Sequence, residues 1–115
     1  MKVTRFAEAQ SYEAPNHRDM RGLRLQGFAA GGPENFWIGL SHFLPGGGAG
    51  PDSSPLEKVY VVLAGAITVQ TPDAEVVLRP HDSCCIPGGE TRTVHNHGNE
   101  VASMLVVMPY PENRA

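Results

Sequence analysis

The chain has 115 residues and a formal net charge of −3, with 41% hydrophobic and 18% charged residues. This length fits one domain with its own hydrophobic core, and the composition excludes a disordered chain. Proteins that bind nucleic acid or an anionic membrane usually carry an excess of positive charge, and this chain has a negative net charge. Neither is therefore expected as a partner.

The first 20 residues are polar and irregular, with Tyr12, Pro15 and His17 spaced as in an extended segment. We predict an N-terminal extended arm over residues 1–20 and one domain over residues 21–115; the role of His17 stays open. No apolar run approaches the roughly 20 residues of a membrane span, and the N-terminus lacks the apolar core of a signal peptide. A cytoplasmic location is the expectation.

Short segments rich in β-branched and aromatic residues follow, separated by glycine, proline and asparagine. The predicted strands span residues 21–26, 36–43, 58–63, 66–70, 75–78, 83–86, 91–96 and 102–108. The segment LPGGGAGPDSSP, residues 44–55, is predicted to be a loop. No segment of ten or more residues shows helical periodicity. These features predict an all-β sandwich or barrel, and periodicity alone does not choose between the two.

Two spaced patterns resemble the motifs of the cupins, G-x5-H-x-H-x3-E-x6-G and G-x5-P-x-G-x2-H-x3-N. They fall on Gly46, Asp52, Ser54, Lys58 and Gly65, and on His81, Pro87, Gly89, Arg92 and Asn96. His81 replaces a motif glycine, whereas the other turn-forming positions are retained. The resemblance covers nearly the whole chain. It implies a single jelly-roll β-barrel, also called a double-stranded β-helix.

All four metal-ligand positions of the family are changed. In cupins, three histidines and one glutamate at these positions bind a divalent metal in the barrel mouth. Here the positions carry Asp52, Ser54, Lys58 and Arg92. A protonated lysine and a permanently charged arginine repel a cation, and one carboxylate does not make a site. The resemblance, with these changes, therefore predicts no metal and no other cofactor.

Alternation along the strands assigns the face that points into the barrel, once Lys58 and Arg92 are placed inward as the resemblance implies. The expected cavity face consists of Lys58, Tyr60, Val62, Arg92 and Val94. His95 and His97 have the spacing of a two-histidine chelate, but they then face outward. His81 is expected in an exposed turn.

Two cations in one partly apolar mouth need a compensating negative charge. An internal carboxylate of Asp52, Glu57 or Glu90 could supply it, and so could a bound anion. Arg92 can clamp a carboxylate or phosphate with two N–H groups, with Lys58 assisting. Burial and a nearby guanidinium both lower the pKa of a lysine, which suits Lys58 to acid–base or Schiff-base chemistry.

These features favour an enzyme that acts on a small anionic molecule without a metal, as an isomerase, lyase or decarboxylase. The candidate catalytic residues are Lys58, Tyr60 and His42, and the candidate substrate-binding residues are Arg92, Asp52 and Ser54. One alternative is a non-catalytic small-molecule-binding cupin. Another is a metal-dependent cupin oxidoreductase whose ligands are drawn from His42, Asp52, His95 and His97.

The resemblance also implies a homodimer, because cupins commonly pack an N-terminal strand or an outer sheet face across subunits. The identity of the substrate and the type of reaction do not follow from the sequence.

Overall fold

The computed structural model describes residues 1–112, which form nine β-strands and two short 3-10 helices, η1 (Phe6–Glu8) and η2 (Phe28–Ala30). The strands are β1 (Ser11–Tyr12), β2 (His17–Gln26), β3 (Phe36–Asp52), β4 (Lys58–Ala64), β5 (Ile67–Gln70), β6 (Glu75–Leu78), β7 (Ser83–Ile86), β8 (Arg92–His95) and β9 (Ala102–Pro109). Within the described residues, no helix is long and apolar enough to cross a membrane.

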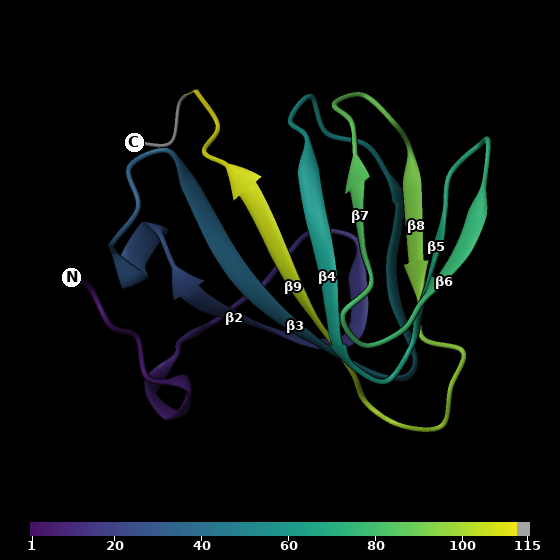
Figure 1. The fold of residues 1–115 in the computed structure, drawn as a ribbon, viewed down its shortest axis with the longest axis horizontal. Coiled ribbons are helices and arrows are strands. Elements are labelled where there is room, and N and C mark those ends of the chain that lie inside the picture. The colour runs from purple at the N-terminus through teal and green to yellow at the C-terminus, as the bar shows by residue number, and fades with distance from the viewer. Residues whose placement is uncertain (113–115) are drawn as a thin grey trace.

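The strands form one antiparallel sheet that curls into a nearly closed barrel (Figure 1). The order along the sheet is β6-β5-β8-β3-β9-β4-β7, and β2 pairs with both β3 and β1. Apart from β5 and β6, which are consecutive, neighbours in this order are not consecutive in the sequence, as in a jelly roll, where long connections cross between the two sides of the barrel. The predicted all-β barrel is confirmed.

The longest strand, β3, corrects the prediction of a loop over residues 44–55, because β3 continues to Asp52. Glycine-rich sequence indicates a turn by default, but here the missing side chains let β3 pass close to its neighbours. A β-carbon at Gly47 would collide with the carbonyl of Asp19 on β2, and one at Gly48 with the carbonyl of Val94 on β8. The glycines therefore allow the second half of β3 to pass close to β2 and β8, whereas its first half pairs with β2 and β9.

The N-terminal segment contributes two strands to the same sheet. β1 pairs with β2, with Tyr12 opposite Gly22, and β2 begins at His17, which pairs with Ala49 of β3. β2 therefore crosses the predicted boundary between arm and domain at residue 21. Residues 113–115, the end of the predicted domain, lie outside the described residues.

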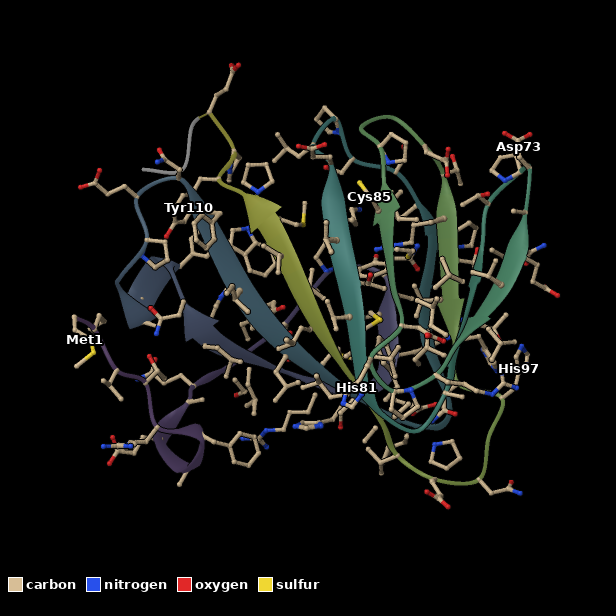
Figure 2. All side chains as sticks on the ribbon, in the orientation of Figure 1. Met1, Asp73, His81, Cys85, His97 and Tyr110 are labelled. Carbon is tan, nitrogen blue, oxygen red and sulfur yellow. The ribbon has the colours of Figure 1, made fainter. Side chains whose placement is uncertain are left out.

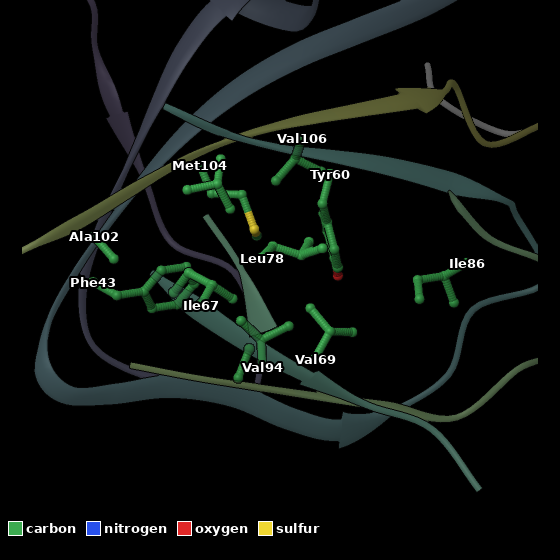
Figure 3. Close-up of a cluster of buried hydrophobic side chains, with 12 residues drawn as sticks. Phe43, Tyr60, Ile67, Val69, Leu78, Ile86, Val94, Ala102, Met104 and Val106 are labelled. Carbon is green, nitrogen blue, oxygen red and sulfur yellow. The ribbon is translucent and has the colours of Figure 1, made fainter. Parts of the chain in front are cut away.

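The core fills the barrel interior beside the cavity described below (Figure 3). Its largest apolar side chains that are at most 1% exposed are Phe43, Val62, Ile67, Val94 and Met104. Each comes from a different strand, so the core ties together both sides of the sheet. Burial of a side chain of this size contributes roughly 1.5 to 3 kcal/mol. This packing fixes the strands that carry the candidate site.

The turns of both motifs adopt the backbone conformations that their sequence predicts. His81, which replaces a motif glycine, has a φ of 75° and is exposed, and Gly65 and Gly89 have φ values of 72° and 84°. Asn96 is 1% exposed, and its Nδ2 donates to the carbonyls of Phe43 and Glu100 at 3.0 and 2.8 Å. The retained motif positions therefore act as turn and loop supports.

Candidate functional site

A cavity of about 290 Å³ lies inside the barrel. Its charged or titratable lining residues are Glu13, His17, Arg24, Asp52, Lys58 and Arg92, and its aromatic lining residues are Tyr12, Phe28, Trp37, Phe43 and Tyr60. The remaining wall is largely apolar and is shared with the core, through Val94, Met104 and Val106. Such a cavity, mostly apolar with a few convergent polar groups, is typical of small-molecule sites.

Arg92 is the most constrained charge in the cavity. It is 6% exposed, and its Nε donates to the hydroxyl oxygen of Tyr60 at 2.7 Å. Its Nη1 is buried and has no hydrogen-bond partner. A buried donor without a partner is costly, and a charged one more so. An anionic ligand could therefore provide the acceptor that this nitrogen lacks.

Lys58 lies on the same cavity and is 5% exposed. It alternates with Tyr60 and Val62 as inward residues of β4, as the sequence predicted. Burial lowers the pKa of Lys58, and the Arg92 charge lowers it further, whereas Asp52 acts in the opposite direction. The lysine can therefore lose its proton more easily than an exposed lysine, which a proton-transfer residue requires.

Tyr60 belongs to the core cluster and also lines the cavity, and Figure 3 shows its hydroxyl pointing into the barrel interior. Burial raises the pKa of Tyr60, although the charge and the hydrogen bond of Arg92 act to lower it. The phenol therefore keeps its proton at neutral pH. Because its oxygen accepts from Arg92, its O–H remains able to donate to a ligand.

Of the other two predicted substrate-binding residues, only Asp52 lines the cavity. Asp52 is exposed, stands opposite Arg92 in the β3–β8 register, and accepts a hydrogen bond from the backbone N–H of Ser53 at 2.9 Å. The Ser54 hydroxyl accepts from the N–H of Leu56 at 3.1 Å, and Ser54 is absent from the cavity lining. The prediction that Ser54 contacts a ligand is not supported, because this serine stabilises the loop after β3.

His42 also lies away from the cavity. Its neighbours Ser41 and Phe43 line the cavity, so strand alternation turns His42 to the other face of β3. There its Nδ1 is 2.8 Å from the hydroxyl of Ser103, and its ring meets Phe6 edge-on. This placement corrects the prediction that His42 reaches the pocket.

The outward placement of His95 and His97 is confirmed. Neither lines the cavity, and their rings lie 4.1 Å apart on the outside of the barrel, where Figure 2 shows His97 at the edge of the molecule. Among the described residues, no group of three or more histidine, cysteine, aspartate or glutamate side chains could hold a metal ion. The two histidines therefore have no third ligand in the part of the chain that the structure describes.

His17 lines the cavity, although the sequence left its role open. Its Nδ1 lies 2.8 Å from the carbonyl oxygen of Pro15, which can only accept, so Nδ1 carries the proton and Nε2 is left as an acceptor. Burial lowers the pKa of His17; Arg92 and Lys58 lower it too, while the Pro15 bond and Asp52 act oppositely. A neutral imidazole at pH 7 suits a general base.

The family follows from comparison with known proteins. The family model of the cupin domain matches residues 39–108, which is more than half of the chain. The chain belongs to the cupin family. This membership agrees with the jelly-roll barrel and with the positions of the two motifs.

Among related proteins, this cupin is 44% identical over 111 residues to a protein named β-D-galactosidase from Mycobacterium tuberculosis (strain ATCC 25618 / H37Rv), covering 96% of each chain. Among solved structures, it is similar to the polyketide cyclase RemF from Streptomyces resistomycificus, with a TM-score of 0.83, 20% identity, and coverage of 99% of this chain and 89% of that one. It is also similar to a predicted oxalate decarboxylase from Thermotoga maritima, with a TM-score of 0.78, 21% identity, and coverage of 96% and 100%. At such identities the two structures show the shared fold.

The metal that cupins bind at the motif positions does not fit the residues present in this chain. Lys58 and Arg92 are both buried cations on the same cavity wall, at two of the four ligand positions. Ammonium and guanidinium groups have no lone pair to give a metal while protonated, and both repel it. The side chains of this site therefore have to supply its chemistry.

Proposed function

We propose that this cupin binds a small molecule with a carboxylate-type anionic group and transfers a proton on it, as a metal-independent isomerase or lyase. The observation that carries the proposal is the buried Arg92 Nη1 without a partner, beside the buried Lys58. A fixed guanidinium and a nearby ammonium offset their desolvation cost only against negative charge. An anionic ligand provides that charge.

The side chains of the cavity supply each part of such a reaction. Arg92 Nη1 holds the carboxylate, and the free Nε2 of His17, or Lys58 once it has released its proton, accepts a proton from a neighbouring carbon. The O–H of Tyr60 donates to the oxygen on which negative charge develops. Return of the proton to a different carbon gives an isomer, whereas departure of a leaving group with its bonding electrons gives a lyase product.

Calorimetric titration with butyrate tests the anion site. Arg92→Met is expected to weaken butyrate binding about tenfold or more, because a hydrogen bond to a charged group contributes roughly 1.5 to 3 kcal/mol. Lys58→Met keeps the length and apolar bulk of the side chain, so most of the butyrate binding should remain. The matched control is Arg21→Met, because Arg21 is an exposed arginine of β2. Equal affinity of the wild type and the Arg92→Met variant would refute the proposal.

Glycoside hydrolysis is a second candidate, favoured by the name of the relative that shares 44% identity over 96% of the chain. Most glycosidases need two carboxyl groups, one as an acid and one as a base or nucleophile. The carboxyl groups that line the cavity belong to Glu13 and Asp52.

If this second candidate holds, the protein hydrolyses o-nitrophenyl β-D-galactoside. Glu13→Gln and Asp52→Asn should then each lower the rate about a hundredfold or more, within the range for loss of a general acid or base. Glu57→Gln is the matched control, because Glu57 is exposed and does not line the cavity. No hydrolysis by the wild type, or equal rates in the variants, would reject this candidate.

A further inference from the structure

Arg24 is a third cation of the cavity, beside Lys58 and Arg92, and the motifs do not predict it. Its guanidinium carbon lies 3.7 Å from the ring centroid of Tyr12, 4.2 Å from that of Phe28 and 4.9 Å from that of Trp37. Three rings thus hold the guanidinium, and all three line the cavity together with Arg24. Cation–π contacts engage the face of the guanidinium and leave its N–H edge for hydrogen bonds.

That N–H edge is incompletely satisfied. Arg24 Nη1 is buried and has no hydrogen-bond partner, and Arg92 Nη1 is the other such side-chain atom among the described residues. Burial lowers the pKa of Arg24, although the neighbouring tyrosines act to raise it. The two buried nitrogens without partners therefore belong to two arginines of one cavity.

The loop that carries Phe28 is built to hold this arrangement. Phe28 has a φ of 51°, which a non-glycine residue rarely adopts, and its ring meets that of Tyr110 edge-on at 5.0 Å. Its backbone N–H donates to the Tyr110 hydroxyl at 3.2 Å. At the preceding Gly27, a β-carbon would lie 2.5 Å from the β-carbon of Trp37, so only glycine fits. Such strain persists where surrounding contacts impose it.

From this geometry we infer a second anion subsite at Arg24, so that the ligand of the cavity carries two anionic groups, one held by Arg92 and one by Arg24. The inference rests on the proposed function, because Arg92 is the first subsite. The largely apolar lining of the cavity suits a ligand whose two charged ends are joined by a hydrocarbon segment. A small dicarboxylate has this chemistry.

Titration with two matched series of ligands tests the second subsite. The unbranched dicarboxylates from succinate to pimelate are compared with the monocarboxylates of equal carbon number, by calorimetry and by the fluorescence of Trp37, the one tryptophan of the chain. One dicarboxylate length is expected to bind at least about tenfold more tightly than its monocarboxylate, as for one added charge-assisted bond. Dicarboxylates that bind no more tightly at any length would overturn the inference without any variant.

Variants separate the two subsites. Arg24→Met should remove the additional affinity of the dicarboxylate over the monocarboxylate and leave monocarboxylate binding unchanged. Arg92→Met should weaken the binding of both ligands. Arg24 also borders a smaller cavity of about 190 Å³ beside Lys2 and Arg5, so the Lys2→Met/Arg5→Met double variant is the control and should keep the additional affinity. If the additional affinity of the dicarboxylate persists in Arg24→Met, or is lost in the double variant, Arg24 does not form a second anion subsite. Monocarboxylates that bind independently of Arg92 would instead contradict the proposed function.

Discussion

Replacing Arg92 by methionine together with Tyr60 by phenylalanine is expected to stabilise the fold while abolishing anion binding. In the wild type, the free protein carries a buried guanidinium nitrogen without a partner. Replacing buried ionic groups by apolar residues of similar volume is often neutral or stabilising by about 1 to 4 kcal/mol. Differential scanning calorimetry should therefore show a melting temperature equal to the wild type or up to roughly 15 °C higher, at about 4 °C per kcal/mol.

The single variants distinguish this explanation from a general effect of hydrophobicity. Arg92→Met alone leaves the Tyr60 hydroxyl, 3% exposed, without the Arg92 donor at 2.7 Å, at a cost of about 1 to 3 kcal/mol. The Arg92→Met single variant should therefore be less stable than the double variant.

Loss of the Arg92 charge should also raise the pKa of Lys58, because that charge lowers it in the wild type. A double variant that melts well below the wild type would show that the buried Arg92–Tyr60 pair stabilises the fold.

Replacing Gly50 by alanine is expected to damage both the fold and the site. Gly50 has a φ of 85°, and a β-carbon there would lie 2.5 Å from the carbonyl oxygen of Arg92 and 2.9 Å from its Nη1. The added methyl group must push β8 away or move the guanidinium. We expect a loss of about 1 to 3 kcal/mol beyond the cost of the backbone conformation, as for an overpacked site, and at least about tenfold weaker butyrate binding.

Gly46→Ala is the matched control for this prediction. Gly46 has the same φ of 85°, but a β-carbon there meets nothing within 4 Å. The alanine should therefore cost only the roughly 1 to 2 kcal/mol of the left-handed conformation, with butyrate binding unchanged. Chemical denaturation and titration of both variants give the comparison. Equal losses of stability and affinity in the two variants would show that contact with Arg92 is not the cause.

The barrel was predictable because its signals are local or lie at fixed spacing. Strands such as β4 combine β-branched residues with alternation, and the turns at Gly65, His81 and Gly89 stand at motif positions that require a positive φ. The continuation of β3 through residues 44–52 was not predictable, because glycine weakens a strand in isolation. Only the close approach of β2 and β8 explains why glycines are needed there.

The candidate site was predictable only where the motifs reach it. Lys58 and Arg92 stand at motif positions, and alternation placed Tyr60 beside them. Arg24 and His17 reach the cavity through the pairing of β2 with β3, which depends on contacts between distant residues. His42 was misplaced because its inward or outward direction depends on the register of β3. The expected homodimer remains a prediction that light scattering can test.

An anion site at the former metal positions can be located by the anomalous diffraction of a crystal soaked in selenate. Selenate is an oxyanion whose selenium can be located without reference to the surrounding protein. We expect a selenium peak whose selenate oxygens lie within about 3 Å of Arg92 Nη1, the distance of a hydrogen bond, and no such peak in Arg92→Met crystals. A cavity free of selenium, or a metal ion bound between Asp52 and Lys58, would contradict this expectation.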